Sequence, residues 1–289
     1  MRIFLSGATG YLGRHLLSSF AESQHDVVAL VNSSSDQSVL GGAPVMVCEL
    51  GSTALRELMA DAGPVDVVVH TAATYGRRGE SALEVCSANT LFALELLDAA
   101  VHNKVPSFVN TDTALPPGAN AYALSKKHFR DWGVYFSVRA EIGFVNIALE
   151  YFFGPGDSSD KFISHVIRSC LANLPELQLT PGEQLRDFIY IDDVLSAYDL
   201  ILDHGRGLGP GFHEFSLGLG HGQTLRQIVE LVHSLCGSTT KLRFGALPYR
   251  PNEVMTSLAN TQALRRLGWQ PSFNLHSGLL KTIEWERLA

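Results

Sequence analysis

The sequence predicts an α/β protein in which a doubly wound parallel sheet of the Rossmann type is joined to a smaller mixed α/β domain. Two observations support this prediction. Short runs rich in Val and Ile alternate with longer stretches of helical periodicity through the first half of the chain, as in successive βαβ units. The first of these runs also enters a glycine-rich turn that leads into a helical segment, which is typical of a dinucleotide-binding fold.

The expected strands of this sheet are short apolar runs separated by helical segments. They are Ile3–Ser6, Val27–Val31, Val45–Glu49, Val65–His70, Ser107–Asn110 and Gly143–Leu149. Leucines at three- and four-residue spacing give the intervening segments one apolar face, as in Leu12, Leu16 and Leu17. Helices with such a face are expected to pack on the sheet.

Composition and charge exclude several classes of protein. The 289 residues are 46% apolar and 18% charged, which is typical of a folded globular chain. Lys and Arg number 22 against 29 Asp and Glu, and the formal net charge of -7 provides no overall attraction for nucleic acid or an anionic membrane. The four cysteines form no CxxC pair, so no metal site is predicted. Without a run of about 18 apolar residues or a signal-peptide pattern, a cytoplasmic location is expected.

The turn after the first strand is the first candidate site, because glycines recur as GxxGxxG between residues 7 and 13. Such glycines permit a tight turn, and they bring backbone N–H groups and the helix dipole close to a pyrophosphate. The alternative is an ordinary glycine-rich turn. The candidate cofactor ligands of this turn are Gly7, Thr9, Gly10, Tyr11, Leu12, Gly13 and Arg14.

The residues after the second strand indicate which dinucleotide binds. Asn32, Ser33 and Ser34 stand where an Asp or Glu usually binds the adenine ribose hydroxyls. A 2′-phosphate would fit this segment better, and Arg14 could supply a cation for it, although an arginine there could also be merely solvated. The expected cofactor is therefore NADPH, in preference to NADH.

A second candidate site combines Tyr122 with Lys126, which lie four residues apart and thus on one face of a helix. The ammonium can lower the pKa of the phenol, which suits a proton donor. The pair follows the expected strand Ser107–Asn110 and the hydroxyl groups of Thr111 and Thr113. These residues should therefore lie at the carboxyl edge of the sheet, where doubly wound folds bind ligands.

Taken in this order, the motifs resemble the extended short-chain dehydrogenase/reductase family, which comprises NAD(P)-dependent sugar-nucleotide epimerases, dehydratases and reductases. The resemblance covers nearly the whole chain. Further matching segments are EL at 49–50, HTAA at 70–73, Asn89, YFFGP at 151–155, RDFIYIDD at 186–193, RPNE at 250–253 and LGWQP at 267–271. Within the family the chain is most similar to ketoreductases of the CDP-paratose and CDP-abequose synthase type, which share the LPP turn at 115–117 and the stretch 154–162.

The resemblance implies a role for each matching residue. Tyr122 would donate the proton and Lys126 would lower its pKa and bond the nicotinamide ribose. Thr111, the first choice, or Thr113 would hydrogen-bond the ketone oxygen. The further cofactor contacts implied are Glu49, Leu50, Thr71, Ala72, Ala73, Asn89, Tyr151 and Phe152. The candidates for substrate binding are Tyr75, Arg77, Thr113, Tyr151, Lys161, Phe162, Gln178, Arg186, Arg250 and Glu253.

The charged substrate candidates differ in what supports them. Arg186 and Arg250 would clamp the substrate pyrophosphate, for which a guanidinium fork is suited. Tyr75 and Arg77 are chosen for their place after the fourth strand, where a solvated basic turn is the alternative. Dehydration is disfavoured, because Thr113 stands where the dehydratases of the family need a Glu.

The expected function is therefore NADPH-dependent reduction of the 4-keto group of a nucleotide-activated deoxysugar. Residues 1–150, with a returning segment near 186–216, would bind the cofactor, and residues 151–289 would mainly bind the nucleotide-diphosphate sugar. A homodimer formed through two helices beside the sheet is expected from the resemblance. The alternatives are an NAD-dependent sugar-nucleotide epimerase and a non-catalytic NADP(H)-binding regulatory protein.

Overall fold

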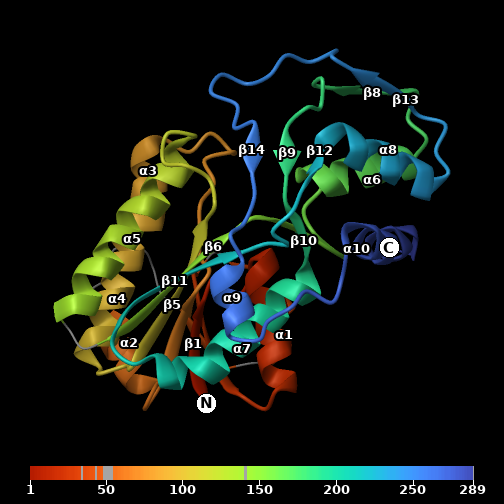
Figure 1. Ribbon diagram of the computed structural model, residues 1–289. Helices are drawn as coiled ribbons and strands as arrows, with labels where there is room; N and C mark the ends of the chain where they lie inside the picture. The colour runs from red at the N-terminus through yellow and green to blue at the C-terminus, as the bar shows by residue number, and fades with distance from the viewer. Residues whose placement is uncertain (34, 43, 48–54, 140–141, 289) are drawn as a thin grey trace. The chain divides into compact units, whose positions relative to one another are not determined.

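The structure, a computed structural model, describes residues 1–33, 35–42, 44–47, 55–139 and 142–288 (Figure 1). The chain forms two compact units. The first unit comprises Met1–Ala148 and Tyr198–Phe215, and the second comprises Leu149–Ala197 and Ser216–Ala289. The part of the chain that returns to the first unit thus starts within helix α7 (Ile191–Leu208).

A seven-stranded sheet in the order β11-β6-β5-β4-β1-β2-β3 forms the centre of the first unit. Its strands are β1 (Arg2–Ser6), β2 (Asp26–Val31), β3 (Val45–Val47), β4 (Val67–His70), β5 (Ser107–Thr113), β6 (Gly143–Leu149) and β11 (Gly211–Leu217). Strand β1 pairs in parallel with both β2 and β4, so the strand order reverses beside it. In doubly wound folds such a reversal marks the ligand-binding edge.

The observed strands agree with those expected, apart from their ends. Strand β5 continues to Thr113, three residues beyond its expected end, so both candidate threonines belong to the strand. Strand β3 ends at Val47, and the last two residues of the expected strand lie outside the described part of the chain.

Helices cover both faces of this sheet (Figure 1). One face carries α2 (Leu55–Asp61), α4 (Phe92–His102) and α5 (Ala121–Arg139), and the other carries α1 (Tyr11–Glu22). The short helix α3 (Ala82–Cys86) continues through a π-helical turn, η2 (Ser87–Leu91), into α4, and a 3-10 turn η1 (Gln37–Leu40) follows β2. The rings of Phe108, Phe129 and Phe144 pack between β5, α5 and β6 with centroids 5.5–5.9 Å apart. This aromatic contact fixes α5 against β5 and β6.

The second unit contains small sheets and helices, as a mixed α/β domain should. Its strands are β7 (Tyr151–Phe153), β8 (Glu176–Leu179), β9 (Leu185–Arg186), β10 (Phe188–Tyr190), β12 (Gln223–Thr224), β13 (Lys241–Phe244) and β14 (Thr256–Ser257). Its helices are α6 (Phe162–Leu171), α8 (Leu225–Cys236), α9 (Gln262–Arg266), α10 (Leu275–Leu288) and the first turns of α7. Across the ranges that the structure describes, no helix is both long and apolar enough to span a membrane.

Candidate active site

The glycine loop lies between β1 and α1, and its geometry requires glycine. Gly7 has a φ of +79°, which L-residues with a side chain rarely adopt. A Cβ atom on Gly13 would lie only 2.0 Å from the carbonyl oxygen of Gly7. Helix α1 begins at Tyr11, and Gly10 has no side chain that could cap this helix start. An anion is the ligand that such a helix start favours.

The segment after β4 lies against this loop, as expected of a shared cofactor site. The hydroxyl of Thr71 donates to the carbonyl oxygen of Ser6 at 2.9 Å, and its backbone N–H donates to the same oxygen at 3.0 Å. A Cβ atom on Gly7 would lie 2.5 Å from the backbone nitrogen of Ala72. The structure thus brings the HTAA segment and the glycine loop together.

The remaining cofactor candidates of this unit lie near β2. Asn32 and Ser33 follow the strand directly, and the hydroxyl of Ser33 donates to the side-chain oxygen of Asn32 at 3.3 Å. The guanidinium of Arg14 lies 5.3 Å from the ring centroid of Tyr11 on the first turn of α1. Ser34, Glu49 and Leu50 lie outside the residues that the structure describes.

Thr113 and Tyr122 meet at the carboxyl end of β5. The hydroxyl of Thr113 lies close enough to the phenol of Tyr122 to lower its pKa, and it accepts the backbone N–H of Leu115 at 3.2 Å. The hydroxyl of Thr111 instead shares a 2.6 Å hydrogen bond with the phenol of Tyr198, which is completely buried. The structure therefore brings Thr113, and not Thr111, to the candidate proton donor.

Lys126 lies one turn after Tyr122 on α5 and is 1% exposed. Its ammonium nitrogen has no hydrogen-bond partner among the described residues. Burial lowers its pKa to about 8, while the carboxylate of Asp112 opposes this shift and the neighbouring Lys127 adds to it. A buried amine without a partner is costly, so this nitrogen is suited to a polar ligand group.

The loop after β4 is fixed beside Tyr122 by Asn89, a residue of the π-helical turn. The side chain of Asn89 accepts the backbone N–H of Thr74 at 2.7 Å and donates to the backbone oxygen of Thr74 at 2.8 Å. It also donates to the hydroxyl of Ser125 at 3.0 Å. These bonds join the loop to α5, where the ring of Tyr75 lies 4.7 Å from that of Tyr122. Burial raises the pKa of the Tyr122 phenol well above its usual value, and Tyr75 adds to this increase.

Arg77 completes this part of the site. Its guanidinium lies 5.3 Å from the ring centroid of Tyr75, within the range of a cation–π contact. Its positive charge lowers the pKa of Tyr122, against the larger effect of burial. The ring of Tyr75 thus contacts the ring of Tyr122, and the guanidinium of Arg77 contacts the ring of Tyr75.

Sequence reasoning missed an ion pair with a buried carboxylate, which lies next to Thr113 and Lys126. The carboxylate of Asp112 lies 2.9 Å from the ammonium of Lys127, and the Asp112 side chain is fully buried. Asn146 of β6 donates to the same carboxylate at 3.0 Å. The sequence signals that could have indicated this pair are Asp112, which lies between the two candidate threonines, and Lys127, which follows Lys126.

Within the second unit, Tyr151, Arg186 and Glu253 lie together. Arg186 is 4% exposed, and its guanidinium forms a 2.8 Å ion pair with Glu253. The guanidinium carbon also lies 5.4 Å from the ring centroid of Tyr151. Burial raises the pKa of the Tyr151 phenol, and Arg186 opposes this effect. Arg250 is exposed, and its carbonyl oxygen accepts the backbone N–H of Glu253 at 3.2 Å within the RPNE turn.

The other candidates of this unit lie on separate elements. Phe152 belongs to β7, and Lys161 immediately precedes α6. The ring of Phe162 stacks on that of Phe188 at 6.2 Å. The amide of Gln178 on β8 donates to Glu176 at 3.2 Å on the exposed side of the strand. In the portion of the chain that the structure describes, no three His, Cys, Asp or Glu side chains form a group that could hold a metal ion.

Comparison with known proteins identifies the class to which this geometry belongs. The sequence profile of the NAD dependent epimerase/dehydratase family matches residues 3–218. The chain belongs to this family, and it is thereby an NAD(P)-dependent enzyme of the extended short-chain dehydrogenase/reductase type.

Among its relatives are two kinds of sugar-nucleotide enzyme. The CDP-abequose synthase of Salmonella typhimurium is 33% identical over 287 residues, which are 96% of this chain and 95% of that protein. The UDP-glucose 4-epimerase of Azospirillum brasilense is 25% identical over 99% of this chain and 92% of that protein. The first similarity bears out the resemblance to the CDP-abequose synthase type.

Solved structures confirm the predicted fold. The UDP-glucose 4-epimerase of Thermotoga maritima, in complex with UDP-glucose, superimposes with a TM-score of 0.89 at 22% identity and covers 100% of this chain and 99% of that chain. The UDP-glucose 4-epimerase of Thermus thermophilus, in complex with NAD, gives a TM-score of 0.87 at 21% identity, with both chains covered completely.

Proposed function

We propose that this protein is an NADPH-dependent reductase of the 4-keto group of a nucleotide-activated 6-deoxysugar. The Thr113 hydroxyl beside the Tyr122 phenol, with the buried Lys126 one turn further along the helix, is the observation that supports this function most directly. The similarity to a CDP-abequose synthase over 96% of the chain supports the substrate class.

The residues of the first unit fit a nicotinamide dinucleotide. The loop can pack this tightly only because its glycines have no Cβ atom, which would collide with the neighbouring backbone. The first turn of α1 would offer N–H groups to a pyrophosphate. The unpartnered ammonium of Lys126 would bond the nicotinamide ribose. When bound, the reduced cofactor supplies the hydride that the reduction needs.

The chain's own side chains would handle the proton. Tyr122 would donate its phenol proton to the oxygen of the ketone as negative charge develops there, and Thr113 would hydrogen-bond the same oxygen. The cation of Lys126 would favour the phenolate that remains, because a nearby positive charge lowers the pKa of an acid. Asn89 keeps the loop that carries Tyr75 in place beside the phenol.

The substrate's nucleotide would be held by the second unit. A guanidinium binds a pyrophosphate with two parallel hydrogen bonds, which suits Arg186 and Arg250. The ion pair with Glu253 keeps the Arg186 guanidinium oriented beside the Tyr151 ring. Tyr151, Lys161, Phe162 and Gln178 remain candidates for the sugar and the base.

The preference for NADPH rests on Asn32 and Ser33. These neutral side chains stand at the end of β2, where an acidic residue would repel a 2′-phosphate. Arg14 on α1 would provide the cation for that phosphate.

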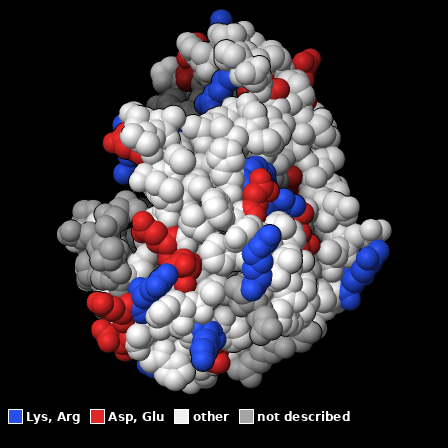
Figure 2. All heavy atoms as spheres, turned by 90° about the vertical axis from the view of Figure 1, so that its left-hand side faces the viewer, with Lys and Arg blue, Asp and Glu red and all other residues white. Residues whose placement is uncertain are grey.

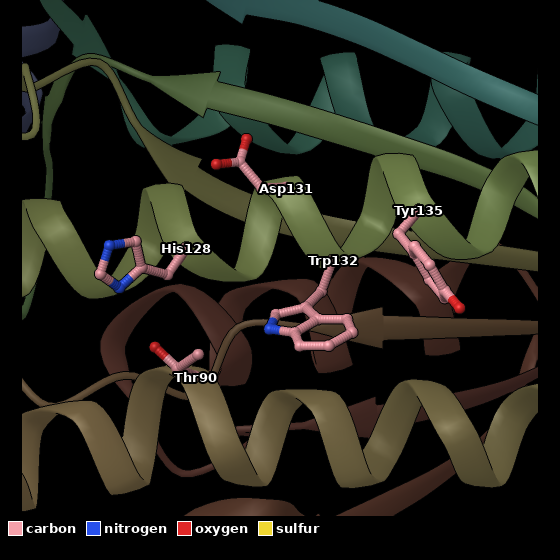
Figure 3. Close-up of a pocket in the computed structure, with 5 residues that line it drawn as sticks. All are labelled: Thr90, His128, Asp131, Trp132 and Tyr135. Atoms are coloured by element: carbon pink, nitrogen blue, oxygen red, sulfur yellow. The ribbon is translucent and has the colours of Figure 1, made fainter.

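A homodimer through α4 and α5 is also proposed. The outer face of α5 and of the turn η2, which leads into α4, exposes large apolar side chains, among them Leu91 (50%), Trp132 (41%) and Tyr135 (46%). Figure 2 looks onto this side of the molecule, where uncharged surface lies between scattered Lys, Arg, Asp and Glu side chains. A shallow pocket between the two helices is lined by Thr90, His128, Asp131, Trp132 and Tyr135 (Figure 3). Two copies of this face, related by a two-fold axis, would cover each other.

Oxidation of NADPH with a panel of substrates tests the proposed function. The purified protein is mixed with CDP-, dTDP-, GDP- or UDP-linked 4-keto-6-deoxysugar, and NADPH or NADH absorbance is followed. We expect stoichiometric oxidation with one of these nucleotides and faster turnover with NADPH. Full turnover by the Tyr122→Phe variant would contradict the role of the phenol.

An NAD-dependent epimerase is the second candidate, favoured by the 25% identity to a UDP-glucose 4-epimerase over 99% of this chain. An epimerase reoxidises its own intermediate, so it retains its nicotinamide cofactor between cycles. Tightly bound NAD in a one-to-one ratio to the purified chain, with no net oxidation of NADPH by any ketosugar, would favour this candidate over the reductase.

A further inference from the structure

Behind Thr113 lies an ion pair that neither the proposed reaction nor the family resemblance assigns. The Asp112 carboxylate is fully buried and accepts three hydrogen bonds: from the ammonium of Lys127 at 2.9 Å, from Asn146 at 3.0 Å and from the backbone N–H of Thr113 at 2.7 Å. Burying an ion pair usually adds little to the stability of a protein, because both charges lose their hydration. Its location therefore calls for an explanation other than folding stability.

The ion pair binds both backbone polar groups of Thr113. Asp112 accepts its N–H, and the ammonium of Lys127 donates to its carbonyl oxygen at 2.6 Å. The Leu115 N–H then fixes the Thr113 hydroxyl, which faces Tyr122. Since Lys127 and Tyr122 belong to the same helix, one ammonium links the end of β5 to the helix that carries the phenol.

The network continues away from the site and ties these elements to the rest of the sheet. Asn146 of β6 accepts the Asn110 amide at 2.8 Å and donates to Glu214 of β11 at 3.1 Å. Glu214 in turn pairs with Arg130 of α5 at 2.6 Å. The hydrogen-bonded chain thus starts and ends on α5, so a shift of the helix along β5 would break several bonds at once.

We propose that the Asp112–Lys127 ion pair is a positioning device that holds the Thr113 hydroxyl against Tyr122 and balances the charge beside Lys126. This inference rests on the proposed function, since it assigns to the pair a role in the same reduction. Lys127 and Asp112 act through Thr113 and are positioning residues rather than catalytic ones.

The charges of the pair act in opposite directions on the groups of the site. Asp112 raises the pKa of both Tyr122 and Lys126, whereas Lys127 lowers the pKa of Lys126. The other groups that affect the pKa of Tyr122 are Tyr75, Arg77 and the Thr113 hydroxyl, and substitution of Asp112 or Lys127 removes none of them. Loss of the cation should therefore shift the titration of the site to higher pH, and loss of the anion should shift it to lower pH.

The first test compares turnover in three variants. Lys127→Met should lower kcat of the reduction at least tenfold and leave the KM for NADPH within twofold, whereas Lys127→Arg, which keeps a donor cation, should recover part of the loss. The matched control is Arg56→Met, which removes an ion pair of similar length to Asp98 on α2 and α4, away from β5 and α5. This control should retain the wild-type kcat. Wild-type kcat in Lys127→Met would overturn the proposal.

The double variant Asp112→Asn/Lys127→Met covers the case in which the single variant fails to fold. It leaves no unpaired buried charge, so it should fold while still lacking the contact from residue 127 to the Thr113 carbonyl. We expect a kcat at least tenfold below the wild type with a pH profile close to that of the wild type. A double variant that folds and retains full kcat contradicts the positioning role.

The second test requires no turnover. Titration of the Lys126 ammonium by ¹⁵N NMR, with Lys126→Met to assign the signal, should give a higher pKa in Lys127→Met and a lower one in Asp112→Asn than in the wild type. Unchanged values, or shifts in one direction for both variants, contradict the proposal. If the wild type reduces no ketosugar, the proposed function fails, and this titration still decides whether the pair balances the charge at Lys126.

Discussion

The two threonines at the end of β5 differ in their partners, which gives a prediction for each. Thr113→Val removes the hydroxyl that faces Tyr122, and we expect kcat to fall about 100-fold, the usual effect of losing one hydrogen-bond donor to a developing oxyanion. Thr111→Val removes the bond to the buried Tyr198 and should cost about 1 kcal/mol of unfolding free energy with little loss of kcat. Steady-state kinetics and urea unfolding of both variants measure this, and an equal loss of kcat in the two would contradict it.

The depressed pKa of Lys126 predicts how stability depends on pH in the cofactor-free protein. Its pKa is about 8 in the folded state, below the ordinary value of 10.5, so between these values the unfolded chain binds more protons. Stability from this group is therefore full above pH 10.5 and is lost as the pH falls toward 8.

Lys126→Met removes this titration and leaves an apolar side chain of similar length. At pH 7 the cofactor-free variant should be more stable than the wild type by about 2–3 kcal/mol, and the difference should vanish toward pH 10.5. Chemical denaturation at several pH values measures it. A constant difference between the two proteins would show that the Lys126 ammonium is not destabilised by burial.

At the scale of an element, the turn between β1 and α1 depends on the absence of side chains. Gly13→Ala would place a Cβ atom 2.0 Å from the Gly7 carbonyl, so the loop must shift. We expect a loss of about 1–3 kcal/mol in stability and at least a tenfold weaker NADPH affinity. Gly118→Ala is the control, because no atom lies within 4 Å of its added Cβ. Fluorescence titration with NADPH should show wild-type affinity for Gly118→Ala; wild-type affinity for Gly13→Ala as well would contradict the predicted role of the loop.

The sequence pattern predicted this turn well because its requirements are local. Glycine spacing, a preceding apolar strand and a following amphipathic helix all lie within about 20 residues, and each follows from backbone geometry. The choice between Thr111 and Thr113 could not be made in this way. It depends on Tyr198, which lies 87 residues further along the chain and reaches Thr111 only through the fold.

The ion pair between Asp112 and Lys127 is likewise a contact that the sequence alone could not predict. Asp112 and Lys127 are 15 residues apart on a strand and a helix, and nothing in their spacing indicates a contact. An acid and a lysine in such segments are more often solvated. Packing of α5 against β5 through Phe108, Phe129 and Phe144 brings them together.

At the scale of the whole molecule, the apolar face of α4 and α5 predicts the oligomeric state. Trp132→Glu/Tyr135→Glu places two charges in the centre of this face and should convert a dimer to a monomer, because burying unpaired charges is costly. Light scattering after size exclusion measures the mass. The control Leu174→Asp changes an exposed leucine of the second unit and should leave the dimer intact. A wild-type protein that is monomeric at high concentration would contradict the proposed interface.

The Rossmann sheet as a whole was predictable, since alternating strand and helix patterns leave few topologies for a parallel sheet. The point at which the chain returns to the first unit was harder to predict. The segment that returns to the first unit begins at Tyr198 within α7, a continuous helix whose sequence carries no break at that point. Only packing partners, such as the bond from Ser19 to Asp199, indicate where the helix changes unit.

Transfer of deuterium from the cofactor to the sugar tests whether Tyr122 and the cofactor carry out a net reduction of a ketosugar. The protein is incubated with NADPH deuterated at its transferable position and with the nucleotide-linked 4-keto-6-deoxysugar that supports turnover, and the product is examined by NMR and mass spectrometry. We predict one deuterium at C4 of the sugar per NADPH consumed, and none with Tyr122→Phe. A converted sugar without deuterium and without loss of NADPH would contradict the proposed reduction and indicate an epimerase.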